Sequence, residues 1–128
     1  MNDQFSLISV TRSMPSRQHP EVSVGYDKED NLVVVFSPAF LSREDVALKL
    51  GTRVLCGYDA ETQRLCVMPA AEGAPSARVL GKRPGFVGAG QLVLSARNLP
   101  EGLPKWEGRK GVSYAFGDEG AVIVDFNA

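Results

Sequence analysis

The sequence predicts a mainly β protein of two related half-units, hairpins plus one short helix, that share a barrel-like or sandwich core. Three observations predict this fold. β-branched and aromatic residues form runs of strand length, turn-forming residues separate most of these runs, and some residues recur at one spacing in both halves of the chain. The 128 residues, of which 44% are hydrophobic and 23% charged, are typical of one globular unit.

Three hairpins are expected, because each of three pairs of apolar runs encloses a short polar stretch rich in Gly and Asp. A further strand is expected near the N-terminus, at residues 5–12. The expected hairpins pair residues 22–24 with Leu32–Phe36, residues 54–56 with residues 65–68, and residues 112–116 with residues 121–126.

One helix of about two turns is expected to begin after Ser42 and to end before Gly51. Ser42 is a favourable N-cap, and Asp45 stands where a capping box has its acidic residue. Lys49 suits the negative end of the helix dipole, and Gly51 suits the position after the helix where φ is usually positive. This helix would connect two strands of the first half-unit.

Composition divides the chain near its middle, at a stretch of Pro, Ala and Gly that has little to bury. Ser, Arg, Gln and Pro are frequent just before residue 20, which is typical of a mobile arm. The expected organisation is a flexible arm at residues 1–20, a first half-unit at 21–69, a linker at 70–76, and a second half-unit at 77–128 packed on the first.

An offset of 60 residues aligns the two halves without a gap. Each half has too few residues to cover its own apolar strand faces, so the halves are expected to interleave or to pack face to face. The offset aligns Leu32 and Val33 with Leu92 and Val93, Gly51 with Gly111, and Gly57 with Gly117.

Residues 31–69 contain an apolar strand, a proline, a helix ending in Leu-Gly, and a hairpin that ends near a second proline. The pieces are Leu32–Phe36, Pro38, Leu50 with Gly51, residues 54–56 and residues 65–69. In this pattern the chain resembles the AbrB-type swapped-hairpin regulators of bacteria and phages, in their tandem-repeat form. The resemblance implies an interleaved β-barrel and transcription regulation through DNA binding. The family's basic residues before the first strand and on the helix are replaced here by Asn31 and by Arg43 with two acids.

The net charge of −1 provides no global attraction to nucleic acid or to an anionic membrane. No apolar run approaches the roughly 20 residues that a membrane-spanning helix needs. The first ten residues lack the basic and apolar regions of a signal peptide. We therefore expect a cytoplasmic protein without a membrane partner.

Charge is unevenly distributed along the chain. Residues 21–76 carry five basic and nine acidic side chains, whereas residues 77–111 carry seven basic and two acidic ones. Such a basic segment can neutralise phosphates, and a tryptophan within it can stack on a base. The alternative is a solvated basic face with the tryptophan in the core. The candidate nucleic-acid-binding residues are Arg78, Lys82, Arg83, Arg97, Lys105, Trp106, Arg109 and Lys110.

Few residues suggest redox, metal or catalytic chemistry. Cys56 and Cys66 lie symmetrically about residue 61, so they could face each other across a hairpin and oxidise. Alternatively, both are small apolar residues on a half-buried face. His19 has no second His and no Cys near it in the sequence. We expect no catalytic residue, no bound metal and no cofactor.

Two functions remain open. The first is a small cytosolic, non-enzymatic binding or regulatory protein of prokaryotic or phage origin that contacts DNA through residues 77–111. The second is a protein-binding or assembly module, such as an accessory phage protein, without a nucleic-acid role. Such a module would bind a protein partner, or a second copy of itself, through acidic hairpin tips or a strand edge.

Overall fold

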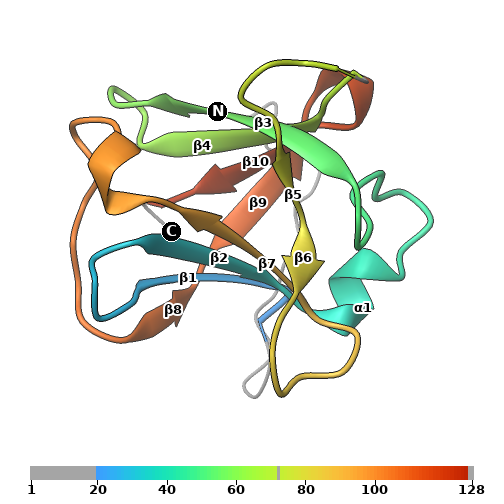
Figure 1. Cartoon of the computed structure of the whole chain (residues 1–128), viewed down its shortest axis with the longest axis horizontal. Coiled ribbons are helices and arrows are strands. Elements are labelled where there is room, and N and C mark those ends of the chain that lie inside the picture. Colours follow the sequence, from blue (N-terminus) through green and yellow to red (C-terminus); the bar gives the residue numbers. More distant parts are fainter. Residues whose placement is uncertain (1–19, 72, 127–128) are drawn as a thin grey trace.

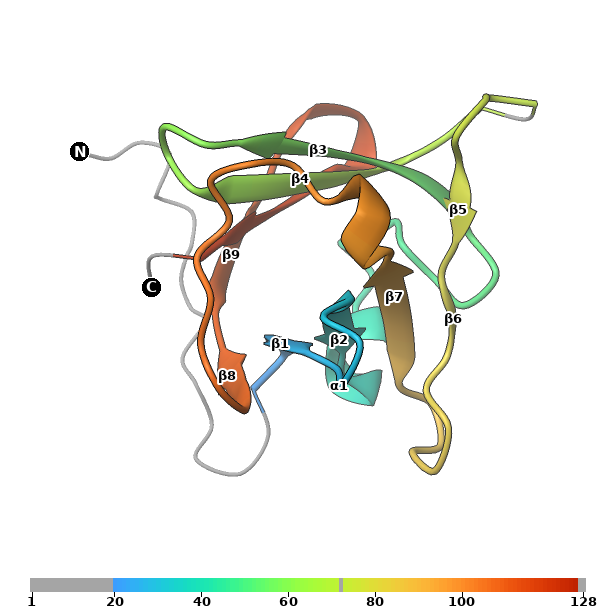
Figure 2. The same ribbon diagram turned by 60° about the vertical axis from the view of Figure 1, so that its left-hand side comes forward.

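The computed structural model describes residues 20–71 and 73–126 of the chain. Two five-stranded antiparallel sheets pack together, with one short α-helix beside them (Figures 1 and 2). The predicted mainly β fold with a shared core is confirmed in its sandwich form, and no closed barrel is found in the described part of the chain. The strand predicted at residues 5–12 and residues 1–19 of the predicted arm lie outside the described residues.

Each sheet contains strands from both halves of the chain. Sheet A consists, in spatial order, of β6 (Gly81–Lys82), β7 (Gly90–Leu94), β2 (Leu32–Phe36), β1 (Val22–Tyr26) and β8 (Arg109–Gly111). Sheet B consists of β5 (Arg78–Val79), β3 (Arg53–Asp59), β4 (Arg64–Pro69), β10 (Val122–Asp125) and β9 (Ser113–Phe116). The helical elements are α1 (Pro38–Leu41) and the 3-10 turns η3 (Ala96–Asn98) and η4 (Asp118–Gly120).

Several elements recur in the same order in the two halves, at a spacing of 58 residues rather than the predicted 60. β7 begins at Gly90 and β2 at Leu32, and Ser95 is the N-cap of η3 as Ser37 is the N-cap of α1. The halves meet where β2 pairs with β7 in sheet A and where β4 pairs with β10 in sheet B. They therefore share one core, while descent from a repeat and the proposed domain boundaries stay predictions.

The three predicted hairpins are confirmed as β1–β2, β3–β4 and β9–β10. In the first turn, Asp27 Oδ1 accepts hydrogen bonds from the backbone N–H groups of Glu29 and Asn31, both at 2.9 Å. In the third turn, Glu119 and Gly120 have φ values of 60° and 82°, which favour glycine and short polar residues. Local turn chemistry thus determines where the chain reverses.

The helix lies before the residues predicted for it. Ser37 is the N-cap of α1, and its Oγ accepts a hydrogen bond from the backbone N–H of Phe40 at 3.1 Å. Pro38 suits the first helical position because its φ is already helical and it has no N–H to satisfy. The Ser-Pro pair therefore starts the helix five residues before Ser42, which instead caps the C-terminal end.

The residues predicted as helix between Ser42 and Gly51 form turns and irregular chain. Val46 and Leu48 are buried and Ala47 between them is exposed, so burial alternates instead of following a helical face. Lys49 Nζ donates to the carbonyl oxygen of Leu41. Lys49 therefore contacts the C-terminal end of α1 from a loop, and the prediction that it lies at the end of its own helix is wrong.

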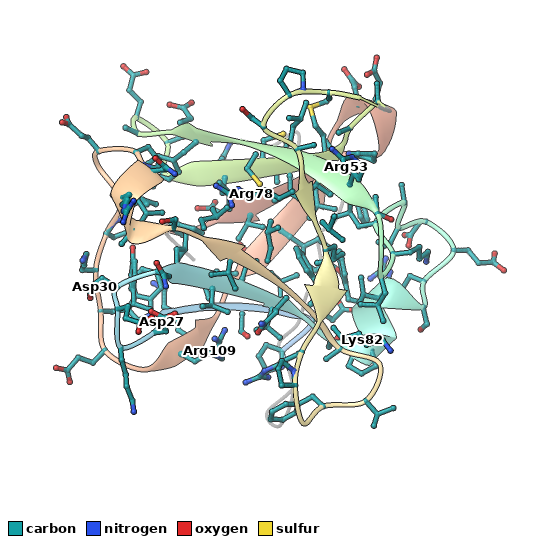
Figure 3. The ribbon with its side chains drawn as sticks, in the orientation of Figure 1. Asp27, Asp30, Arg53, Arg78, Lys82 and Arg109 are labelled. Carbon is teal, nitrogen blue, oxygen red and sulfur yellow. The ribbon has the colours of Figure 1, made fainter. Side chains whose placement is uncertain are left out.

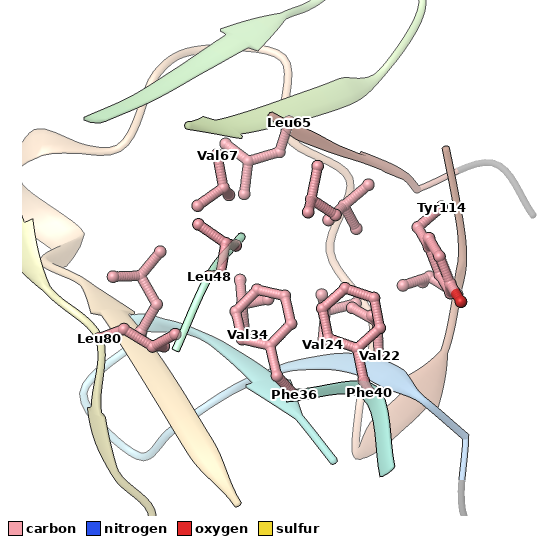
Figure 4. Close-up of a cluster of buried hydrophobic side chains, with 14 of the residues drawn as sticks. Val22, Val24, Val34, Phe36, Phe40, Leu48, Leu65, Val67, Leu80 and Tyr114 are labelled. Carbon is pink, nitrogen blue, oxygen red and sulfur yellow. The ribbon is translucent and has the colours of Figure 1, made fainter. Parts of the chain in front are cut away.

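The core lies between the two sheets (Figure 4). The rings of Phe36 and Phe40 stack with their centroids 5.4 Å apart, and Tyr114 meets Phe40 edge-on at 5.0 Å. Burying side chains of this size stabilises the fold by roughly 1.5–3 kcal/mol each. None of the helical elements in the described residues is long and apolar enough to span a membrane, and the predicted cytoplasmic location stays a prediction.

Candidate anion-binding cleft

The outer face of sheet A is covered, although sheet B packs on its other face. Leu32, Val34 and Phe36 of β2 point into the core, so Val33 and Val35 point outward. Those two valines are nevertheless only 8% and 5% exposed. Side chains and a loop from the second half of the chain therefore cover this face.

Arg109 is one of these covering groups. It lies opposite Gly25, whose missing side chain leaves room, because a Cβ there would stand 3.1 Å from the Gly108 carbonyl oxygen and 3.5 Å from the Arg109 Cβ. Across this open position Arg109 NH1 donates to Ser23 Oγ at 3.3 Å and approaches the Val33 carbonyl oxygen at 3.5 Å. The guanidinium is thereby held against the sheet.

The loop between β6 and β7, residues 83–89, is the second covering group, and we call it the rim loop (Figure 2). The backbone N–H of Arg83 donates to the Ala89 carbonyl oxygen at 2.9 Å and closes the loop. Gly85 and Gly88 have φ values of 82° and 83°, which side chains rarely adopt. A Cβ on Gly88 would lie 3.2 Å from the Pro38 Cβ, so the loop packs tightly on α1.

An open cleft of about 640 Å³ lies between Arg109 and the rim loop. Arg83 enters it from the loop, with its Cζ 3.8 Å from the centre of the Phe86 ring. Of the carboxylates in residues 20–71 and 73–126, none forms an ion pair with Arg83 or Arg109. The described lining residues are Pro20, Ser23, Val35, Ser37, Pro38, Arg83, Gly85, Phe86, Val87, Ala89, Arg109 and Gly111.

The two arginines affect each other electrostatically. Burial lowers the pKa of Arg109, and the positive charge of Arg83 lowers it further. Both effects act against the charged form, which an arginine nevertheless keeps at neutral pH. The cleft therefore combines mostly apolar walls with two cations that have no ion-pair partner among the described residues, and this arrangement can bind an anionic group.

The other predicted residues do not join this cleft. Arg78 lies on β5 of sheet B, where its NH1 approaches the Val93 carbonyl oxygen at 3.5 Å. Lys82 lies on β6, at the opposite edge of sheet A from Arg109 (Figure 3). Arg97 lies in η3, beside the β1–β2 turn, because the neighbouring Ala96 N–H donates to Asn31 Oδ1. None of these three cations lines the cleft, although Lys82 directly precedes Arg83 in the chain.

The remaining predicted residues lie near a cluster of aromatic rings formed by Tyr26, Trp106 and Phe126. They are Lys105, Trp106 and Lys110. The Trp106 ring meets the rings of Tyr26 and Phe126 edge-on at 5.2 and 6.0 Å. Lys110 Nζ stands 4.6 Å from the centre of that ring, and Lys105 Nζ lies 4.0 Å from an acidic side-chain oxygen of the β1–β2 turn. Because side chains alternate along a strand, Lys110 and its neighbour Arg109 lie on opposite faces of β8.

The two cysteines do not face each other. Cys56 pairs with Val67 and Cys66 pairs with Gly57, so the register differs by one residue from the predicted symmetry about residue 61. A one-residue difference places the two side chains on opposite faces of sheet B. Both are free, and burial raises the pKa of Cys56 to about 11. The alternative, two small residues on partly buried faces, describes them better.

Sequence reasoning missed the non-basic residues of the cleft, chiefly Ser23, Val35 and Phe86. The chain offered one signal, an Arg-Pro-Gly-Phe stretch at residues 83–86, in which an exposed turn carries an aromatic side chain. Among the described residues, no group of three or more His, Cys, Asp or Glu side chains could hold a metal ion.

Comparison with protein-family models, curated proteins and solved structures found no match to this chain. The resemblance to the AbrB-type regulators therefore stays a prediction that rests on the residues quoted for it.

Proposed function

We propose that this chain is a small non-enzymatic binding protein and that the cleft between Arg83 and Arg109 holds an anionic group of its partner. The observation that carries the proposal is that two arginines line one cleft without a described carboxylate to neutralise them. Bringing like charges together is unfavourable, and an anion bound between them offsets that cost. Binding would therefore stabilise the fold.

The polar groups of the cleft support binding rather than catalysis. Its described lining residues include no His, Cys, Asp or Glu that could act as a base for the serine hydroxyls. Both serine oxygens accept hydrogen bonds, Ser23 Oγ from Arg109 NH1 and Ser37 Oγ from the Phe40 N–H. Arginine recognises carboxylates and phosphates through two parallel hydrogen bonds, which suits the role proposed for Arg83 and Arg109.

A protein partner is favoured over duplex DNA. A DNA backbone is neutralised by a row of cations along its phosphates, whereas Arg78 lies on sheet B and Arg97 lies in η3, and neither lines the cleft. Trp106 packs against Tyr26 and Phe126 of the protein itself. The regulator implied by the AbrB-type resemblance is the second candidate, and the excess positive charge of residues 77–111 favours it.

The proposal is tested on the full chain, labelled with ¹⁵N, by following arginine side-chain NMR signals during titration. The two probes are poly-glutamate and a mixed-sequence DNA duplex of about 20 base pairs, at roughly 50 mM and 200 mM salt. We expect poly-glutamate to shift the signals of Arg83 and Arg109, and the double variant Arg83→Gln with Arg109→Gln to weaken its binding.

The matched control is Arg53→Gln with Arg97→Gln, which removes the same charge from two exposed positions outside the cleft. It should keep nearly all of the binding. Equal weakening by both double variants would mean that net charge alone attracts the probe, and the proposal would be wrong. Tighter binding of DNA than of poly-glutamate, lost in the cleft variant, would favour the second candidate.

A further inference from the structure

We infer that the partner's binding segment is an acidic peptide stretch in which a carboxylate stands next to an apolar side chain. This inference rests on the function proposed above and adds the chemistry of the partner. The carboxylate would lie between Arg83 and Arg109, and the apolar side chain would lie on Phe86 and Val87 at the tip of the rim loop.

The rim loop exposes two large apolar side chains next to the arginines. Val87 is 98% exposed and Phe86 is 54% exposed, and both line the mouth of the cleft. Exposed apolar side chains that adjoin one another mark contact surfaces more often than isolated ones do. Their position beside Arg83 means that one partner segment can reach both the charged and the apolar groups.

Backbone hydrogen bonds order the loop that carries these side chains. Two further backbone hydrogen bonds cross it, from the Phe86 N–H to the Arg83 carbonyl oxygen and from the Ala89 N–H to the Phe86 carbonyl oxygen, both at 3.2 Å. Gly88 packs closely against the side chain of Pro38, and the Arg83 guanidinium lies over the Phe86 ring. A surface that is already ordered loses little conformational entropy when a partner binds.

The apolar rim favours a macromolecular segment over a small ligand. The cleft of about 640 Å³ has the size of a small-molecule site. A small ligand confined between the arginines would still leave the almost fully exposed Val87 in water. A peptide that continues over the rim would cover it.

The donors of the cleft suit an acidic stretch of peptide. The Ser23 and Ser37 oxygens accept hydrogen bonds from Arg109 and from the Phe40 N–H, and the two guanidinium groups are the charged donors among the described lining residues. A guanidinium can bind a carboxylate through two parallel hydrogen bonds. One carboxylate balances only half of the charge of two arginines, so further acidic residues in the same stretch would be favourable.

The test is selection from a random peptide library displayed on phage, with the full chain as bait. We expect enriched peptides to carry Asp or Glu within about two residues of an aromatic or aliphatic residue. A representative enriched peptide is then synthesised, and its binding is measured by fluorescence anisotropy. Enrichment of basic or neutral peptides, or of none above background, would overturn the inference.

Two variants separate the charged from the apolar contact. The double variant Arg83→Gln with Arg109→Gln should weaken binding of the synthetic peptide at least about tenfold. The double variant Phe86→Ser with Val87→Ser should weaken this binding several-fold. The control Arg53→Gln with Arg97→Gln should stay within about twofold. Full retention of binding by the Phe86–Val87 variant would overturn the apolar part, and thereby the inference.

The nature of the anion is tested with two further peptides. One replaces the acidic residue by Asn or Gln, and the other replaces it by phosphoserine. The neutral peptide should lose binding, and tighter binding of the phosphoserine peptide would overturn the choice of a carboxylate. If poly-glutamate shifts the arginine signals while the library yields no acidic, apolar peptide, the inference fails and the proposed function stands.

Discussion

Two groups of arginine side chains show what a charge does in this fold when it is paired and when it is not. Arg43 contacts Asp45 through two hydrogen bonds of 2.7 and 2.9 Å, and its NH1 donates to Tyr114 Oη at 2.7 Å. Arg83 and Arg109 form no ion pair with any described carboxylate. The paired arginine has a structural role, whereas the unpaired ones can bind a partner.

The structural role of Arg43 is to connect three segments that are distant in the sequence. Its guanidinium lies 3.4 Å from a carboxylate oxygen of Glu21, which precedes β1, and Tyr114 of β9 donates its hydroxyl proton to the same carboxylate. Burial, followed by the hydrogen bond to Glu21, raises the pKa of Tyr114, so its hydroxyl stays protonated well above neutral pH. Among the described residues the two arginines of the cleft have no such ion pair, although Arg109 donates a hydrogen bond to Ser23 Oγ.

The largest expected effect comes from removing the aromatic support beneath the paired arginine. Phe40 is fully buried between Phe36 and Tyr114, so Phe40→Ala leaves a cavity and should lower the free energy of unfolding by about 3–5 kcal/mol. Urea denaturation followed by tryptophan fluorescence measures the loss. Phe86→Ala, on the exposed rim, is the matched control and should change stability by less than about 0.5 kcal/mol.

The next largest effect is the difference in stability between variants of the paired and the unpaired arginines. Arg43→Gln should cost about 1–2 kcal/mol of stability, because partly buried Glu21 and Tyr114 lose a charged partner while solvent still screens the site. Arg83→Gln should change stability by less than about 0.5 kcal/mol. Equal losses in urea denaturation of the two variants would contradict the division into paired and unpaired arginines.

The hairpins could be predicted from the sequence because each depends on residues close together in the chain. Asp27 and Asn31 form the first turn with each other, and the third turn contains Gly120 in a conformation that glycine favours. The β3–β4 turn was located correctly, but its register was not. Gln63 adopts a φ of 57°, and the turn pairs Asp59 with Arg64, a register that the sequence pattern did not determine.

The helix and the cleft illustrate two different limits. Ser37 and Ser42 are both acceptable N-caps, and Pro38 decides between them only once its place at the first helical position is recognised. Arg83 and Arg109 are 26 residues apart and meet because β8 pairs with β1 while the rim loop packs on α1. Such a contact depends on strand order, which neither composition nor spacing reveals.

A smaller expected effect concerns how stability changes at acid pH. The hydrogen bond from Arg43 lowers the pKa of Asp45, so this carboxylate contributes stability above its unfolded pKa and loses that contribution as the pH falls through its lower, folded pKa. Asp45→Asn should therefore flatten the loss of stability below about pH 4. Thermal denaturation between pH 2 and pH 6 measures this.

The cleft variant Arg83→Gln with Arg109→Gln is the control for that pH dependence. It removes no ion pair with a carboxylate that the structure describes. Its loss of stability with falling pH should therefore have the same slope as that of the unsubstituted protein. A shallower slope in the cleft variant would reveal a carboxylate partner for these arginines. The cleft would then resemble the site around Arg43.

The smallest expected effect is an increase, not a decrease, in the free energy of unfolding. Arg83→Met keeps a long side chain that can pack on Phe86 but removes the positive charge that faces Arg109. Relief of this repulsion should raise the free energy of unfolding by roughly 0.2–0.5 kcal/mol at low salt. The gain should shrink in about 0.5 M NaCl, where exposed charges are screened within a few ångströms. A loss of stability at both salt concentrations would mean that Arg83 stabilises the fold as Arg43 does, and the reason for assigning the cleft to a partner would be gone.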